Sequence, residues 1–327
     1  MAAEKGMAVL GEVFDFTTKS ITDVGLDGLE GIHEAHRYAW VDVDFSDPVA
    51  AMERLEPLKL CPREVLEEAF TADPATQLGR YDDCLHLTLT GCRLAGHSFT
   101  LERVDAVITE RYLLTLHHGP AAFLEAVRKH HRADFARFAK SPSFLIYELW
   151  DHLIENYLGV QKRFEERVEA LQHTLIGDVD DRVFSEVSEL ASDLLHLRKV
   201  VLPARSVLSE LSTRRSLYVS EATQGFLANM VGTVERVLQD LLVARDILSG
   251  SLNLYLSRVS HRTNNVMTKL TVVSVIFMPL SFLCGVYGMN LTDIPEQHWA
   301  HAYPAFWGAC ALIVGGLLYF LKRNKLL

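Results

Sequence analysis

The sequence predicts an α+β protein in three parts: an N-terminal α/β domain, a long helical stalk and two transmembrane helices. Strand-like and helix-like segments alternate over residues 1–140. Helical spacing then continues with few breaks over residues 141–265. Two apolar segments long enough to cross a bilayer dominate residues 266–327.

The first part mixes strand and helix patterns. Alternating apolar and polar positions, or short apolar runs, predict strands at Tyr38–Phe45, Leu85–Leu89 and Tyr112–Leu116. Between them, helical spacing of apolar residues occurs at Cys61–Phe70 and Ala121–His131. Strands beside helices predict one compact α/β domain, which we expect to be cytoplasmic.

The second part begins after Pro142 and is almost entirely helical. Helical patterns extend over Phe144–Leu175 and Val183–Leu211, and we expect a kink at Pro203. A third helix is predicted to begin after Ser220, whose hydroxyl can act as the N-cap.

No proline follows this cap until Pro279, and apolar residues recur at alternating steps of four and three: Met230, Val234, Val237, Leu241, Ala244 and Leu248. A heptad seam of this kind indicates a helix that packs on neighbouring helices in a coiled-coil manner. Continued into the first membrane span, the helix would be roughly 100 Å long.

The third part contains two uncharged apolar segments, Leu270–Tyr287 and Ala302–Leu321. At a rise of 1.5 Å per residue, they are about 27 and 30 Å long, which matches the thickness of a hydrocarbon core. Two such segments joined by a short loop favour membrane spans, at about 266–287 and 302–321, over a pair of buried core helices.

Positive charges flank both spans on one side: Lys269, Lys322, Arg323 and Lys325. The loop at 288–301 carries Asp293 and Glu296 but no Lys or Arg. The positive-inside rule therefore predicts that both termini are cytoplasmic and that the loop is outside. Because the first thirty residues lack a continuous apolar segment, we expect no cleaved signal peptide.

Composition argues against several classes of function. The net charge of -10 disfavours a nucleic-acid partner, because phosphate binding needs an excess of Lys and Arg. The five cysteines form no CxxC pair, so neither a disulfide framework nor a zinc ribbon is indicated. There is no GxxxxGK[ST] loop and no Ser/His/Asp or Cys/His arrangement, so we expect neither an enzyme nor a bound cofactor.

The segment from Val259 to Asn290 carries the functional argument. Gly288, Met289 and Asn290 follow Tyr287 at the outer end of the first span. In this position the tripeptide resembles the Gly-Met-Asn signature of the CorA family of magnesium/cobalt transporters, which includes ZntB-like proteins. Weaker similarity extends to Tyr147-Glu148-Leu149 and covers nearly the whole chain. The resemblance implies a funnel-shaped homopentamer in a cell membrane, with a pore lined by the first span and a selectivity filter at the signature.

Eight residues recur at steps of three and four along this helix: Asn264, Met267, Thr271, Ser274, Met278, Ser281, Gly285 and Gly288. This stripe is polar, small or thioether, whereas the other faces carry Val, Ile, Phe and Leu. Small residues also suit tight helix packing, but an amide and two long Met side chains favour pore lining. By resemblance, Met267, Leu270 and Met278 form hydrophobic constrictions that gate by dewetting.

The resemblance also suggests regulatory and accessory residues. Family members sense intracellular magnesium through carboxylates at subunit interfaces, and Glu68 and Asn229 occupy the matching positions. Because Asn229 lacks a charge, this sensor is expected to be weak, displaced or absent. Asp293 and Glu296 are expected to attract cations to the outer mouth.

We therefore expect passive, gated influx of Mg²⁺, with Co²⁺ and Ni²⁺ as further candidate substrates. The expected partners are further copies of the chain, divalent cations and the lipid bilayer. Two alternatives stay open. A ZntB-like zinc transporter is compatible with Asn229 and with the loop histidines His298 and His301, whereas Met289 favours magnesium. The other alternative is a membrane-anchored sensor that conducts nothing.

Overall fold

The computed structural model describes residues 7–25, 36–70, 75–176, 182–289 and 299–324. The chain divides into two compact units, Met1–Ser249 and Gly250–Leu327, which are described in turn.

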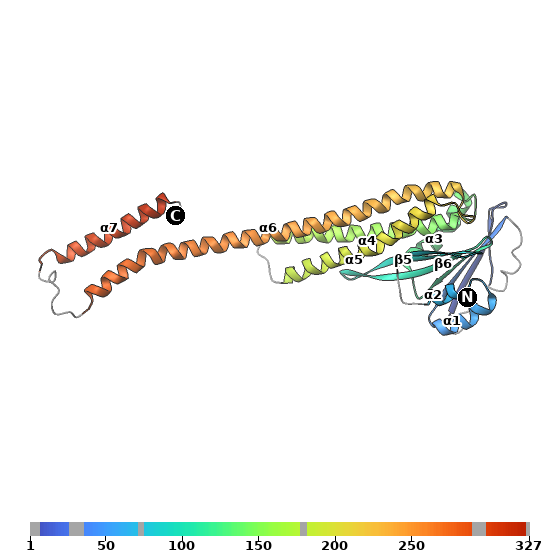
Figure 1. Ribbon diagram of the computed structural model, residues 1–327, viewed down its shortest axis with the longest axis horizontal. Helices are drawn as coiled ribbons and strands as arrows, with labels where there is room; N and C mark the ends of the chain where they lie inside the picture. The colour runs from blue at the N-terminus through green and yellow to red at the C-terminus, as the bar shows by residue number, and fades with distance from the viewer. Residues whose placement is uncertain (1–6, 26–35, 71–74, 177–181, 290–298, 325–327) are drawn as a thin grey trace. The chain divides into compact units, whose positions relative to one another are not determined.

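A seven-stranded sheet forms the core of the first unit (Figure 1). Its strands are β1 (Met7–Asp15), β2 (Ser20–Asp23), β3 (Arg37–Phe45), β4 (Gln77–Arg80), β5 (Leu85–Ala95), β6 (Ser98–Ile108) and β7 (Tyr112–His117). They lie in the order β2-β1-β3-β7-β6-β5-β4. Strands β3 and β7 are parallel, and the other neighbouring pairs are antiparallel.

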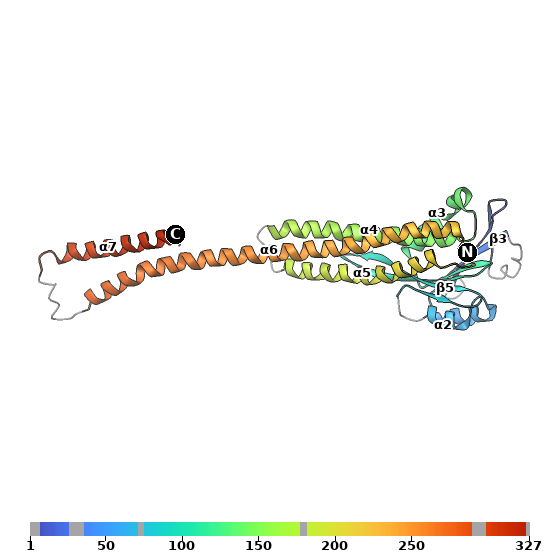
Figure 2. The same cartoon turned by 45° about the horizontal axis from the view of Figure 1, so that its top comes forward.

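Helices cover both faces of this sheet (Figure 2). On one face, α1 (Pro48–Leu55), the 3₁₀ turn η2 (Glu56–Leu58) and α2 (Arg63–Ala69) lie over β3 and β7. On the other face lies α3 (Ala122–Phe138), whose His131 contacts the ring of Trp40 at 5.1 Å between centroids.

The two faces explain why β3 is buried along almost its whole length. Val41 and Val43 pack in the cluster with α1 and α2, whereas Trp40 and Asp42 point to α3, where Asp42 pairs with Arg128. Successive side chains of a strand point to opposite faces, so a central strand covered on both sides has no exposed face.

The strands predicted at 38–45, 85–89 and 112–116 are confirmed as β3, β5 and β7, and β5 extends to Ala95. The sequence did not predict β6, in which Glu102, Arg103 and Asp105 resemble a surface segment. Asp105 is nevertheless only 2 % exposed, because polar partners from neighbouring segments satisfy its carboxylate.

Three long helices follow: α4 (Phe144–Ile176), α5 (Arg182–Thr213) and α6 (Glu221–Tyr287). The predicted N-cap of α6 is confirmed, since Ser220 Oγ accepts a hydrogen bond from the backbone N–H of Thr223 at 3.2 Å. Every residue of the predicted apolar seam is buried, from Met230 to Leu248. The seam therefore does pack against other parts of the first unit.

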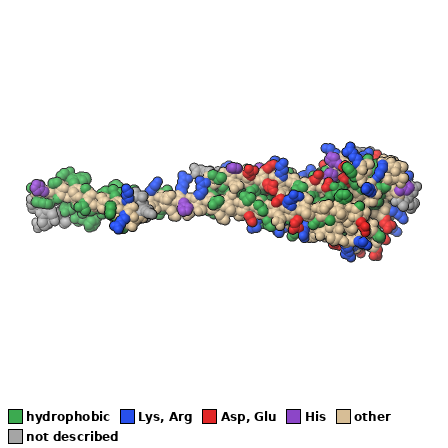
Figure 3. All heavy atoms as spheres, turned by 90° about the horizontal axis from the view of Figure 1, so that it is seen from above, with side chains coloured by type: hydrophobic (Ala, Val, Ile, Leu, Met, Phe, Trp, Pro, Cys, Tyr) green, Lys and Arg blue, Asp and Glu red, His purple; other side chains and the backbone are tan. Residues whose placement is uncertain are grey.

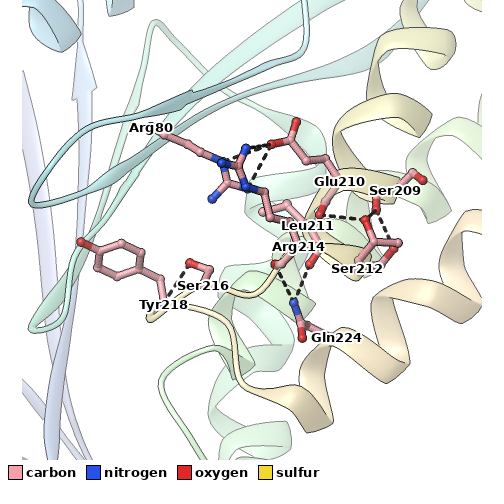
Figure 4. A network of polar contacts seen from close by, with 10 residues as sticks. Arg80, Ser209, Glu210, Leu211, Ser212, Arg214, Ser216, Tyr218 and Gln224 are labelled. Carbon is pink, nitrogen blue, oxygen red and sulfur yellow. Dashed lines mark hydrogen bonds and ion pairs between the residues drawn. The ribbon is translucent and has the colours of Figure 1, made fainter.

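A polar network holds the connection between α5 and α6 (Figure 4). Arg80 of β4 donates from Nε to Glu210 of α5 at 3.1 Å, and Arg214 donates to the same carboxylate at 3.4 Å. Gln224 of α6 donates to the carbonyls of Leu211 and Arg214 at 3.2 and 2.8 Å. These bonds satisfy carbonyls left over at the end of α5 and fix the start of α6 beside the sheet.

The second unit contains the C-terminal part of α6 and α7 (Ala302–Arg323). Both helices are long and apolar enough to cross a membrane, and both agree with the predicted spans. Hydrophobic side chains gather over this unit in Figure 3, where the visible Asp and Glu side chains lie over the first unit. An apolar exposed surface of this kind is typical of a protein whose solvent is lipid.

Candidate functional site

All eight residues of the predicted stripe are exposed on α6. Met267 is 57 % exposed and Met278 is 71 % exposed. On an adjacent face, Thr268, Val272 and Ile276 are partly buried. The stripe is therefore a different face of the helix from the partly buried one, and its side chains make few contacts within this single chain.

The partly buried face of α6 corresponds to a partly buried face on α7. Cys310 and Leu321 are buried there, and Phe306 contacts the ring of Tyr287 edge-on at 5.5 Å between centroids. When two antiparallel helices pack side by side, each helix buries one face and leaves its other faces exposed. Helix α7 thus packs against a face of α6 other than the stripe.

Two hydroxyls in the stripe are already hydrogen-bonded within the helix. Thr271 Oγ1 donates to the carbonyl of Met267 at 2.8 Å, and Ser274 Oγ donates to the carbonyl of Leu270 at 2.9 Å. Since each hydroxyl proton is used, each oxygen presents only lone pairs outward. The stripe therefore offers neutral hydrogen-bond acceptors, which suit the water shell of a cation.

A further oxygen comes from the backbone. Pro279 lies inside α6 and has no N–H, so the carbonyl of Val275 loses its intrahelical donor. That carbonyl lies one residue beyond Ser274. The sequence analysis missed this group, although the proline itself was the available signal.

Helix α6 ends at the signature. The N–H of Gly288 donates to the carbonyl of Cys284 at 2.9 Å, and a Cβ at Gly288 would lie 2.8 Å from that same oxygen. Glycine is therefore required here by a close backbone approach. Met289 is 56 % exposed, whereas Asn290, Asp293, Glu296 and His298 lie outside the described residues.

The predicted regulatory residues lie on different elements of the first unit. Glu68 on α2 is partly buried, accepts a hydrogen bond from Gln77 Nε2 and lies 3.4 Å from His86 Nδ1. Asn229 is exposed on α6. In the part of the chain that the structure describes, no hydrogen bond or ion pair joins Glu68 to Asn229.

Glu68 belongs to a buried network that sequence reasoning missed. Its backbone carbonyl accepts from Arg103 Nη2 at 2.8 Å, and Arg103 also pairs with Asp105 at 2.7 Å. Burial by itself would raise the pKa of Asp105, but hydrogen bonds from His86 and Arg103 outweigh it and hold that pKa below its ordinary value. The available signal was the polar alternation His86, Thr88, Thr90 on β5.

Metal-binding side chains do not gather elsewhere in the described ranges. No group of three or more His, Cys, Asp or Glu placed to hold an ion occurs there. His117 lies 3.3 Å from Asp42 and is buried in the sheet. The stripe on α6 thus stands as the candidate functional site.

The chain is similar to known proteins over most of its length. The family model described as "CorA-like Mg2+ transporter protein" matches residues 35–323. The cobalt/magnesium transport protein CorA of Thermotoga maritima is 28 % identical over 230 residues, which cover 70 % of this chain and 66 % of that protein. The zinc transport protein ZntB of Yersinia enterocolitica is 21 % identical over 336 residues, with 99 % of both chains covered.

A solved structure supports the fold. The complete structure of the CorA magnesium transporter from Methanocaldococcus jannaschii superposes with a TM-score of 0.82 at 16 % identity and covers 99 % of both chains. At this level of identity the similarity shows the fold and leaves the transported ion open.

Proposed function

Since the chain belongs to the family of CorA-like Mg²⁺ transporter proteins, we propose that it carries Mg²⁺ into the cell by passive, gated conduction. The observation that carries this proposal is the exposed stripe on α6. It lies among the faces that α7 leaves free, it presents neutral oxygens, and it ends at the Gly-Met-Asn signature.

A pore requires several copies of the chain, because one helix cannot enclose a water-filled path. We propose a homopentamer, the arrangement implied by the resemblance, in which each stripe residue becomes a ring around the axis. A ring would also cover the exposed Met267 and Met278, whose large apolar surfaces are otherwise left open.

Neutral oxygens fit Mg²⁺ in a particular way. This ion gives up its water shell reluctantly, so a site that accepts hydrogen bonds from the bound waters avoids the cost of dehydration. Thr271 Oγ1, Ser274 Oγ and the carbonyl of Val275 can act in this way, as can the amides of Asn264 and Asn290. We propose that Asn290, with Gly288 and Met289, forms the selectivity filter.

The proposed gate lies on and beside the same stripe. Rings of Met267, Leu270 and Met278 would form apolar constrictions from which water withdraws when the pore is narrow. Membrane potential supplies the driving force, since a divalent cation gains about 4.6 kcal/mol per 100 mV of inside-negative potential. Influx therefore needs no coupled energy source.

Orientation follows from charge. We propose that both termini are cytoplasmic, since Lys269, Lys322 and Arg323 lie at the corresponding ends of the two spans. Asp293 and Glu296 would then lie outside and attract cations to the pore mouth. The functional division that we propose is 1–140, 141–265 and 266–327.

Zinc is the second candidate substrate. It is favoured by the similarity to ZntB, whose identity to this chain is close to that of the magnesium transporters, and by the amide at Asn229. Met289 at the signature favours magnesium instead. A sensor that conducts nothing is the third candidate, and the continuous stripe argues against it.

Flux into proteoliposomes with a potassium-diffusion potential tests all three candidates. We expect uptake of Mg²⁺, with Co²⁺ and Ni²⁺ competing for entry, and we expect Asn290→Ala to abolish uptake without changing oligomer size on a sizing column. Faster Zn²⁺ than Mg²⁺ uptake would support the zinc alternative. Absence of flux for every ion would support the sensor.

A further inference from the structure

The first unit contains a cavity of about 590 Å³ at the end of α3, beside the first turns of α4 and α6. Its size is within the range of pockets that hold small molecules. None of the residues proposed for ion conduction lines it. Its walls differ in chemistry: two cations, several aromatic rings and one carboxyl group.

The cations are Arg137 and Lys140. Both are exposed, and neither forms an ion pair or a hydrogen bond with the described residues. This is notable in a chain with 42 Asp and Glu against 32 Lys and Arg, where acidic partners are plentiful. Two unpaired cations beside a cavity can bind a doubly charged anion.

Aromatic rings form the apolar part of the cavity wall. Phe138 is 67 % exposed and Phe226 is 59 % exposed, and Tyr147 contacts Phe226 at 5.7 Å between ring centroids. Flat exposed rings at a cavity provide stacking surfaces for a planar group. Inorganic phosphate alone would leave these surfaces unused.

Glu148 lines the cavity and is 4 % exposed. Its carboxyl makes no hydrogen bond within the described residues, and the ring nitrogen Nε2 of His152 lies 3.7 Å from it. Burial raises the pKa of Glu148 to about 8, and the nearby carboxylates of Asp134 and Asp151 add to the shift. The carboxyl is therefore mostly protonated at neutral pH and can both donate and accept a hydrogen bond.

The start of α6 forms the polar rim of the cavity. Ser141 and Ser220 line the cavity there, and Ser141 Oγ donates a hydrogen bond to Ser220 Oγ at 3.3 Å. The N-terminus of a helix carries a partial positive charge. Phosphate oxygens placed near Arg137 and Lys140 would lie beside this rim.

We propose that this cavity binds a nucleoside monophosphate, with the phosphate at Arg137 and Lys140, the base stacked on the ring of Phe226, and the edge of the base bonded to Glu148. The carboxyl offers a donor next to an acceptor, which is the pattern that a nucleobase edge can match. This proposal does not rest on ion conduction.

Isothermal titration calorimetry on the detergent-solubilised full chain tests the proposal, with AMP, GMP, CMP and UMP as probes. Inorganic phosphate and adenosine serve as partial ligands. We expect at least one nucleotide to bind about tenfold or more tightly than either partial ligand. Removal of both cations by Arg137→Ala with Lys140→Ala should weaken that nucleotide by about tenfold or more.

Control variants separate binding from folding. Lys129→Ala removes an exposed cation from the same helix, outside the cavity, and should leave the affinity unchanged. Phe226→Ala should weaken nucleotide but not phosphate, and each variant is checked for an unchanged circular dichroism spectrum. Absence of binding for all four nucleotides at millimolar concentration overturns the proposal. Equal affinity in the double variant, or phosphate as tight as nucleotide, overturns it too.

Discussion

Polar residues have opposite fates in the two units. In the sheet, Asp105 is 2 % exposed and receives hydrogen bonds from His86, Thr88 and Arg103. On α6, Thr271 and Ser274 are exposed and their oxygens face outward from the chain. The first arrangement is complete within one chain, whereas the second would become a polar path only in the pentamer that we propose.

This difference allows effects of a substitution on stability to be distinguished from effects on transport. A buried carboxylate with its partners costs much free energy to disrupt, because the partner left behind is a desolvated charge. A polar side chain on an exposed helix face costs little when replaced, because nothing in the chain depends on it. Substitutions in the sheet should therefore affect folding, and those in the stripe should affect flux.

The largest effect on stability is expected for Asp105→Ala. It leaves Arg103 and His86 without their buried acceptor, so the free energy of unfolding should fall by about 3–5 kcal/mol. Denaturant titration followed by circular dichroism measures this change. Ser274→Ala is the matched control and should change the free energy of unfolding by less than about 0.5 kcal/mol. Similar shifts for both would remove the contrast between the two units.

The largest effect on flux within the stripe is expected for Met278→Asp. A carboxylate ring would hold water in the proposed constriction, so passive cation leak should rise several-fold. Uptake at zero internal Mg²⁺ and at high internal Mg²⁺ measures it, because a leak persists under both conditions. Val273 is exposed on α6 outside the stripe, so Val273→Asp serves as the control and should not raise the leak. A leak no greater than that of the parent chain would place Met278 away from the gate.

A pH effect of intermediate size is expected from Glu148. Its pKa is about 8 in the folded chain, against 4.5 in the unfolded chain. The folded state thus holds the proton more tightly, so the contribution is fully present below about pH 4.5 and is lost as pH rises to about 8. Over that window the free energy of unfolding should fall, by less in total than the value expected for Asp105→Ala, because solvent screens part of the effect. Glu148→Gln should flatten this slope, and an unchanged slope would contradict the assigned pKa.

The smallest effect is expected for the regulatory pair. Asn229→Asp adds a negative charge at an exposed position, so the channel should be half closed at a few-fold lower internal Mg²⁺ concentration. Glu68→Ala removes a charge, so half-closure should require a higher concentration. Flux measured against internal Mg²⁺ gives both midpoints. Glu64→Ala changes an exposed carboxylate on the same helix and should change nothing. Superimposable curves for all variants would exclude this interface as the sensor.

Sequence reasoning succeeded where the signal was local. The N-cap at Ser220 and the seam from Met230 to Leu248 need only helical spacing, and both are confirmed. It failed at β6, because Glu102 and Asp105 look exposed until their partners on other segments are known. The network around Glu68 was missed for the same reason.

Helical periodicity and the absence of charge were sufficient to predict the two spans and the stripe on α6, since each depends on residues within a few turns of one helix. The signature at the end of α6 was identified by its resemblance to the family. Tertiary contacts were needed to learn which face of α6 packs near α7 and which carboxylates are satisfied inside the sheet. Those outcomes depend on how different elements pair, as in the β5–β6 hairpin, which brings His86 and Thr88 to Asp105 from 19 and 17 residues away. Spacing along a sequence carries no information on which distant donor a buried carboxylate will meet.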